Sequence, residues 1–337
     1  MKRFLNLTAA VALCASTPAF AQEAKTYPAP SEIVTAAKAQ EWAAIATSDL
    51  LVMDLAPDAA GKPRRVVIQL MPDPFSQGWI GNIRKLATAK WWDGTSINRV
   101  QDNYVVQWGD ATEKKALPDG LEKVPESSYT TPLTDPFAGM LLFAAIVGQK
   151  EAADACKRES EDKISDCYRE IERQVMRRDP YGDLYGFYKG WPAGADPKAA
   201  WPLHCYGMVG VGRNLSPDTG TGAELYTVIG HAPRHLDRNI AVVGRVIEGI
   251  EHLSSLPRGT GALGFYEKEE ERVPILSVRL GTEVQNAPSF EYLYTQTPSF
   301  KAYADARANR RDPFFITPAG GADICNISVP VPHRPAK

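Results

Sequence analysis

The chain has 337 residues, of which 38 are Lys or Arg and 40 are Asp or Glu, giving a formal net charge of −2. These charges are spread without a basic patch, which argues against nucleic acid or an anionic membrane surface as a partner. The length fits one domain with additions. We therefore expect the partners to be proteins or peptides.

The N-terminus has the features of a secretory signal peptide. Two basic residues stand near the start, an apolar stretch covers Phe4 to Ala15, and Ala19-Phe-Ala21 supplies the small residues of a cleavage site. Lipidation of Cys14 is the competing interpretation, but Leu13 before it is bulkier than the residue that lipoprotein signals normally carry. We expect residues 1–21 to be removed and the mature protein to be periplasmic or secreted.

A strand and a helix are the first elements predicted after the leader. Arg65 to Leu70 is β-prone. The segment from Ser76 to Lys90 carries apolar residues at the spacing of one helix face, namely Trp79, Ile80, Ile83 and Leu86. A turn-like run, Trp91-Trp-Asp-Gly94, follows the predicted helix.

The next segment, Arg99 to Asp110, is predicted to form a hairpin. Two short β-prone runs flank Gln101-Asp-Asn103, which has the composition of a turn. Because side chains alternate along a strand, Val105 and Gln107 share one face, and a guanidinium from the partner strand can lie over it. From the residues alone, the segment also fits a core hairpin with a solvated arginine.

A long segment, Ala111 to Leu203, separates this hairpin from the next β-prone block. It opens with a Pro-containing loop from Leu117 to Pro136 and continues with a predicted helix that ends near Arg178. Its apolar run Met140 to Val147 is too short to cross a membrane, which takes roughly 20 residues, so we expect no membrane insertion after the leader is removed. A group of aromatic residues then fits either a small second core or a peptide-binding surface: Tyr181, Tyr185, Phe187, Tyr188, Trp191 and Trp201.

Further β-prone blocks and a C-terminal extension complete the chain. The blocks are Gly207 to Gly212, Gly222 to Val228, Leu236 to Gly249 and Ile275 to Leu280. Residues 283–337 are expected to form an extension packed onto the preceding domain, with a polar helix from Ser299 to Arg310.

Of the five cysteines, four lie beyond the leader, which suggests two disulfides in an exported protein and allows three pairings. We favour Cys156 with Cys167, around a charged segment, and Cys205 with Cys325, which ties the tail to the domain. The first bond excludes one continuous helix between its cysteines, because eleven residues at 1.5 Å each would hold the Cα atoms roughly 16 Å apart, beyond the ~7 Å limit. Metal binding is disfavoured because no Cys-x-x-Cys pair occurs.

The hairpin from Arg99 to Asp110 resembles the signature of the cyclophilin family of peptidyl-prolyl isomerases. The strand, helix and turn before it, and the blocks from Gly207 to Gly249, are similar to the other cyclophilin blocks and stand in the same order. The resemblance covers about residues 50–110 and 204–281, and it identifies the chain as a divergent bacterial cyclophilin-type isomerase.

The resemblance implies a mainly β fold with helices. We expect a cyclophilin-like eight-stranded antiparallel β-barrel capped by helices, with a large, partly helical insertion and a C-terminal extension. The expected organisation is a signal peptide at 1–21, a cyclophilin-like domain at 22–282 with its insertion at about 111–203, and the extension at 283–337.

It also implies a catalytic pair. Arg99 matches the arginine that lies against the prolyl nitrogen, and Gln107 matches the glutamine that orients the carbonyl of the substrate. Because such an arginine acts on the twisted amide directly, we expect no metal and no cofactor.

The remaining site residues implied by the resemblance bind substrate. Tyr104, Val105, Tyr226 and Leu236 match the proline pocket. Glu224 stands where the family has Gln, Arg213 lies near the substrate-binding Asn, and His235 aligns near a position where many members carry Trp or Phe. These departures make the pocket unusual for the family.

The function implied is peptidyl-prolyl cis-trans isomerisation of X–Pro bonds in exported proteins, with proline-containing proteins or peptides as partners. Two alternatives stay open. One is a noncatalytic chaperone that binds Pro-containing peptides in the same groove. The other is an assembly module in which the insertion and the tail are interaction surfaces.

Overall fold

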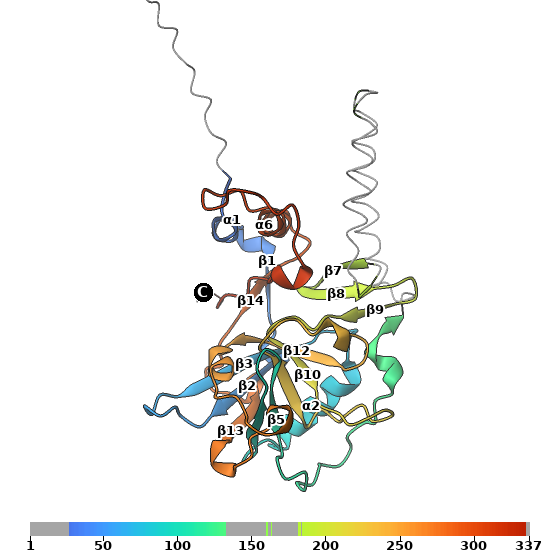
Figure 1. Cartoon of the computed structure of the whole chain (residues 1–337), viewed down its shortest axis with the longest axis vertical. Helices are drawn as coiled ribbons and strands as arrows, with labels where there is room; N and C mark the ends of the chain where they lie inside the picture. Colours follow the sequence, from blue (N-terminus) through green and yellow to red (C-terminus); the bar gives the residue numbers. More distant parts are fainter. Residues whose placement is uncertain (1–26, 133–159, 161–162, 164–180, 183, 335–337) are drawn as a thin grey trace, which may run out of the picture.

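A closed barrel of eight antiparallel strands forms the centre of the structure (Figure 1). The computed structural model describes residues 27–132, 160, 163, 181–182 and 184–334. The barrel strands are β2 Leu50–Leu55, β3 Arg64–Leu70, β4 Ser96–Val100, β5 Val105–Gly109, β10 Met208–Val211, β11 Leu225–Val228, β12 Val242–Glu248 and β13 Val273–Leu280. Around the barrel they follow the order β10, β11, β5, β4, β13, β2, β3, β12, and β12 pairs again with β10. The predicted eight-stranded antiparallel barrel is confirmed.

Both faces of the first two barrel strands are apolar, because each face has something to cover it. Leu51 and Met53 of β2 belong to the main core, whereas Leu50, one residue earlier, belongs to a second cluster with Val67 of β3. Since side chains alternate along a strand, these two sets lie on opposite faces. Phe290, from the C-terminal extension, packs in the second cluster and covers the outer face.

The structure has four described α-helices, α1 Pro30–Ala36, α2 Gln77–Thr88, α5 Glu251–Ser254 and α6 Pro298–Ala308. Short 3₁₀ helices join them: η1 Ala39–Glu41, η2 Thr47–Asp49, η3 Glu126–Tyr129, η4 Arg234–Leu236, η5 Ala262–Gly264, η6 Glu269–Glu271, η7 Gly281–Glu283 and η8 Ile324–Asn326. The predicted helix after β3 is α2, and its four predicted apolar residues are all buried. Among the described residues, no helix has the length and apolar character needed to span a membrane.

The described part of the insertion forms a four-stranded sheet beside the barrel. Its strands are β6 Thr131–Pro132, β7 Leu184–Tyr188, β8 Trp191–Ala195 and β9 Ala199–Pro202, in the order β6, β9, β8, β7. Trp191 and Trp201 are fully buried and belong to the same core cluster as the barrel, so they are core residues that extend the main core and do not form a second one. The helix predicted to end near Arg178 lies outside the described residues, as does the last part of the predicted Pro-containing loop.

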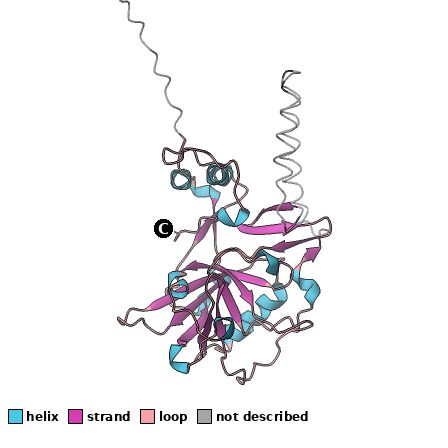
Figure 2. Ribbon diagram, viewed as in Figure 1, coloured by secondary structure: helices cyan, strands magenta, loops and turns pink. Residues whose placement is uncertain are grey.

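The C-terminal extension packs mainly against the N-terminal segment. Strand β14 Glu291–Leu293 pairs with β1 Trp42–Ala44, and α6 lies beside α1 (Figures 1 and 2). Leu293, Phe300 and Tyr303 form their shared core. In the structure, the segment from α1 to β1, which belongs to the expected domain at 22–282, contacts the extension. The apolar residues of α1 and β1 are too few to be assigned to either partner from the sequence.

A disulfide joins the extension to the end of the insertion. Cys205 and Cys325 are bonded, with their Cα atoms 5.1 Å apart and a sequence separation of 120, which confirms the predicted pair. The other predicted pair, Cys156 and Cys167, lies outside the described residues.

Candidate active site

A β-bulge aims Arg99 out of the barrel. Strands β4 and β5 pair Ile97 with Trp108 and Arg99 with Gln107, so Asn98 is an extra residue between two paired ones. In a regular strand, Ile97 and Arg99 would share one face. The bulge separates them: Ile97 is buried in the core, whereas Arg99 is half-buried and lines a cavity on the outside of the hairpin.

The turn of the hairpin is held by the loop after β11. Asn103 has a φ of 50°, in the left-handed region that Asn tolerates better than most residues. Its side-chain oxygen accepts a hydrogen bond from the backbone N–H of His231 at 2.8 Å, and the Tyr104 carbonyl accepts one from the Ile229 N–H at 2.9 Å. These bonds explain why the predicted turn lies where it does.

Polar and aromatic neighbours fix the guanidinium of Arg99. Its Nε donates to the Leu263 carbonyl at 2.7 Å and its Nη1 donates to Gln107 Oε1 at 3.0 Å, while Nη2 donates to the side chain of Gln101. The guanidinium also lies 5.3 Å from the ring centroid of Phe265. Contacts of this kind hold the group in one orientation.

Arg99 keeps donors available for a ligand. A guanidinium has five N–H groups, and three of them make the hydrogen bonds just described. The two others have no partner among the described residues. Burial lowers the pKa of Arg99 from its ordinary value, but a guanidinium starts so high that it stays charged at neutral pH. Arg99 can therefore donate from a fixed cation to an acceptor in the cavity.

The cavity has a volume of about 680 Å³ and brings most of the predicted site together. Eight of the nine predicted catalytic and substrate-binding residues line it: Arg99, Tyr104, Val105, Gln107, Arg213, Glu224, Tyr226 and Leu236. His235 lies in η4 with an exposed side chain and is not among the lining residues. Its neighbours explain this, because Arg234 is buried on one side and Leu236 lines the cavity on the other.

An apolar pocket forms one end of the cavity. Val105, Tyr226 and Val228 are buried together, Tyr104 and Ile240 pack against them, and all of these except Val228 line the cavity. The pairing of β5 with β11 sets Tyr226 opposite Gln107 and Val228 opposite Val105, so this apolar cluster begins next to the Arg99 and Gln107 pair. We call the cluster of these five residues the apolar pocket.

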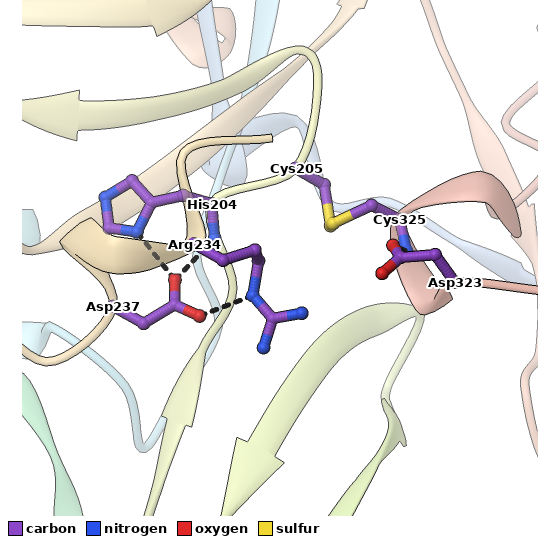
Figure 3. Close-up of a disulfide and its surroundings, with 6 residues drawn as sticks. All are labelled: His204, Cys205, Arg234, Asp237, Asp323 and Cys325. Carbon is purple, nitrogen blue, oxygen red and sulfur yellow. Dashed lines mark hydrogen bonds and ion pairs between the residues drawn. A yellow bond between two sulfur atoms is a disulfide. The ribbon is translucent and has the colours of Figure 1, made fainter. Parts of the chain in front are cut away.

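A buried polar network lies behind the apolar pocket. The Tyr226 hydroxyl is 2.9 Å from Nε2 of His204, and Nδ1 of His204 is 2.9 Å from the Asp237 carboxylate. Arg234 Nε donates to the other oxygen of Asp237 at 2.5 Å. Figure 3 shows the side chains of His204, Arg234 and Asp237 together. Burial raises the pKa of Tyr226 well above its ordinary value, so the hydroxyl stays protonated and can donate.

Glu224 and Arg213, two charged residues that line the cavity, differ in their surroundings. Burial raises the pKa of Glu224 to about 7, with the negative charges of Asp110 and Glu113 adding to the effect and a hydrogen bond from Gln107 opposing it. Arg213 is held by carbonyls: its Nε and Nη2 donate to Asn239 at 3.1 and 3.0 Å. The cavity thus contains an acid that titrates near neutral pH beside Gln107.

Sequence reasoning missed His204, Gln101, Leu263 and Phe265. A signal for His204 was present, because a tyrosine in an apolar pocket needs a buried partner for its hydroxyl and the chain has only five histidines. Phe265 and Leu263 come from a loop between the recognised blocks. No pattern in that loop points to Arg99.

A closed antiparallel barrel that carries an Arg and Gln pair beside an aromatic apolar pocket has the architecture of a cyclophilin. The sequence agrees: the family model described as "Cyclophilin type peptidyl-prolyl cis-trans isomerase/CLD" matches residues 59–280. The chain therefore belongs to the cyclophilin-type peptidyl-prolyl cis-trans isomerases.

A solved structure shares this fold at low sequence identity. The cyclophilin AquaCyp293 from Hirschia baltica is similar with a TM-score of 0.58 and 19% identity, over 87% of this chain and 93% of that chain. A Cryptosporidium parvum cyclophilin-type isomerase, crystallised in the presence of the dipeptide Ala-Pro, has a TM-score of 0.35 and 9% identity, over 68% of this chain and 98% of that chain. No curated protein sequence matches this chain.

Proposed function

We propose that this protein isomerises X–Pro bonds of exported proteins, with Arg99 stabilising the transition state and without a cofactor. The observation that carries the proposal is the Arg99 and Gln107 pair, joined by a 3.0 Å hydrogen bond in a cavity that also contains the apolar pocket. A proline ring needs an apolar site, and the amide next to it needs a donor. Both are present within one cavity.

The reaction is slow without a catalyst because rotation breaks amide resonance. The barrier is about 18–20 kcal/mol, which leaves X–Pro isomerisation on a scale of tens to hundreds of seconds. As conjugation is lost, the prolyl nitrogen gains a lone pair that can accept a hydrogen bond. A donor that meets this lone pair acts more strongly on the twisted amide than on the planar one, and each ~1.4 kcal/mol of difference is tenfold in rate.

In this proposal Arg99 supplies that donor and Gln107 orients the carbonyl before the proline. Tyr104, Val105, Tyr226 and Leu236 hold the proline ring, while Glu224 and Arg213 contact the flanking peptide. The contacts of Arg99 with Leu263 and Gln107 support this role, because they orient the cation before substrate arrives.

Export is supported by two features. Residues 1–21 have the composition of a signal peptide. The bond between Cys205 and Cys325 fits an oxidising compartment such as the periplasm or the exterior, where disulfides persist. We propose that the substrates are proteins that reach this compartment.

A noncatalytic chaperone or assembly module using the same groove is the second candidate. Glu224 favours it, because an acid that ionises near pH 7 beside Gln107 changes the polarity of the surface that would hold the peptide carbonyl. In that case the groove would bind X–Pro peptides without accelerating their exchange.

An NMR exchange assay on an X–Pro peptide tests the proposal with the protein lacking residues 1–21. We expect Arg99→Ala to lower kcat/KM by about 100-fold, the effect of removing one transition-state donor. Arg65→Ala is the control, since Arg65 is exposed at the start of β3 in a pair with Asp54. Wild-type rates in a folded Arg99→Ala protein would remove the mechanism. Peptide binding without exchange in the wild type would favour the second candidate.

A further inference from the structure

The polar network behind the apolar pocket has a defined direction. A carboxylate only accepts hydrogen bonds, so Nδ1 of His204 carries the proton that Asp237 accepts at 2.9 Å. In the neutral imidazole the Nε2 atom of His204 is then the acceptor, and the Tyr226 hydroxyl donates to it. The chain of donors therefore runs from Tyr226 through His204 to Asp237.

Every member of this network is held by more than one contact. The backbone N–H of His204 also donates to Asp237 at 2.9 Å, and Arg234 donates to the second carboxylate oxygen. The His204 and Asp237 side chains are 1% and 2% exposed. The rings of His204 and Tyr226 are nearly parallel, with an interplanar angle of 11°. At this burial, water cannot reach the His204 and Asp237 side chains to replace their hydrogen bonds.

The barrel makes room for the Tyr226 ring. A Cβ atom on Gly210 of β10 would lie 2.3 Å from the Tyr226 hydroxyl, far inside van der Waals distance. Any other residue at position 210 would push the hydroxyl away from His204. The glycine, the histidine and the tyrosine thus fit one another.

The same carboxylate also holds a second part of the pocket wall. Leu236, which lines the cavity, lies between Arg234 and Asp237 in sequence, and these two side chains are bonded to each other at the end of η4. Asp237 therefore fixes both the partner of Tyr226 and the segment that carries Leu236.

We propose that His204 and Asp237 are positioning residues of the proline site, His204 acting through Tyr226 and Asp237 acting through His204 and the Leu236 segment. The inference rests on the proposed isomerase function, and it assigns the shape of the proline site to residues that never touch the substrate. The pocket contacts the proline ring in the same way whether the X–Pro amide is planar or twisted. Loss of this positioning therefore weakens binding of the ground state and of the transition state equally. Such uniform losses raise KM and leave kcat in place.

Two variants and their combination test this. Tyr226→Phe removes one oxygen atom, and His204→Leu replaces the imidazole with an apolar side chain of similar size. We expect each to raise KM about 3- to 10-fold at unchanged kcat, which is the range that the loss of one hydrogen bond supports. The double variant is expected to match the worse single variant, since both remove the same interaction. His252→Gln, in the short helix α5, is the matched histidine control and should leave KM unchanged.

The dissociation constant for a peptide with a central Ala-Pro bond, measured by NMR titration, gives a readout that needs no turnover. Unchanged KM and dissociation constant in folded Tyr226→Phe protein would overturn the inference, as would additive effects in the double variant. If His204→Leu does not fold, Tyr226→Phe decides the question alone. A wild type that binds the peptide without isomerising it refutes the proposed function but leaves the positioning test intact through the dissociation constants. A wild type that does neither overturns both.

Discussion

The proposed catalytic pair, Arg99 and Gln107, and the apolar pocket lie side by side in one cavity, but they are held in different ways. Arg99 is half-buried, and its partners Leu263, Gln101 and Gln107 lie around an open cavity. Tyr226 is supported from behind by His204 and Asp237, which water does not reach. The comparison teaches that the group proposed to do the chemistry contributes little to the fold, whereas the group that shapes the pocket is part of the core.

The two parts also differ in what they are connected to. The hairpin of β4 and β5 is made entirely within the barrel. His204, in contrast, lies between β9 of the insertion and β10 of the barrel, directly before Cys205, whose disulfide leads to the C-terminal extension. The insertion and the extension are therefore joined to the pocket and not to the catalytic pair.

The largest effect we expect is on stability, from Asp237→Ala. This change removes the carboxylate to which Arg234 and the His204 Nδ1 proton are bonded in the core, and breaking a buried ion pair from one side costs about 3–5 kcal/mol. Urea denaturation followed by fluorescence measures the loss of unfolding free energy.

The control for Asp237 is Asp54→Ala. Asp54 pairs with Arg65 at 2.8 Å on the barrel surface, where such pairs contribute about 0–1 kcal/mol. If Asp237→Ala and Asp54→Ala lower the unfolding free energy equally, the network behind the pocket does not contribute to the core as its burial indicates.

The next effect concerns the disulfide. Replacing Cys205 and Cys325 together by Ala is expected to lower the unfolding free energy by about 2–4 kcal/mol, because the bond closes a loop across 120 sequence positions. We expect the structure to loosen around the apolar pocket before it loosens around Arg99, so that KM rises more than kcat falls.

Limited proteolysis of the disulfide variant tells where the structure loosens. Cleavage is expected near Cys325, in the extension, before any cleavage in the hairpin of β4 and β5. Early cleavage in that hairpin would contradict the separation of the two regions.

The sequence allowed the barrel to be predicted well, because its strands carry apolar residues in the order that the family resemblance supplied. It also placed Val105 and Gln107 on one face of their strand with Arg99 on the partner strand, since side-chain alternation is a local property, but it did not predict the bulge at Asn98 that turns Arg99 toward the cavity. The need of the Tyr226 hydroxyl for a buried partner could be read from the sequence, but the choice of His204, 22 positions away, depends on how the strands pack. The pairing of α1 and β1 with the extension is equally nonlocal, and no motif marks either partner.

A smaller effect is expected from pH, through Glu224. Its pKa of about 7 in the folded protein lies above the value of 4.5 that applies to the unfolded chain, so the folded state binds more protons between these two pH values. Stability therefore falls as the pH rises from about 4.5 to about 7, by roughly 2–3 kcal/mol. Urea denaturation at a series of pH values measures this slope.

The variant Glu224→Gln removes the titrating group and should flatten the slope, with a gain in stability at pH 8. Glu122→Gln is the control, because the Glu122 side chain is 65% exposed. If Glu224→Gln keeps the wild-type slope, another group causes the pH dependence, and burial of Glu224 does not measurably lower the unfolding free energy.

The smallest effect on stability is expected from Arg99→Ala, the same change that we expect to remove most of the activity. The carbonyl of Leu263 and the amides of Gln101 and Gln107 lie around an open cavity, so water can replace the guanidinium once it is gone. We expect a loss below about 1 kcal/mol in unfolding free energy.

Arg245→Ala provides the contrast with a buried arginine. Arg245 donates to Gln69 Oε1 at 2.9 and 2.8 Å and to the Gly190 carbonyl at 2.7 Å, and it lies over the Trp191 ring. Removing Arg245 leaves these buried acceptors without a donor and out of reach of water, so we expect it to lower the unfolding free energy far more than the same truncation at Arg99. Equal losses for the two arginines would mean that the hairpin of β4 and β5 depends on Arg99 for its fold, and a loss of activity in Arg99→Ala could then no longer be assigned to the proposed chemistry.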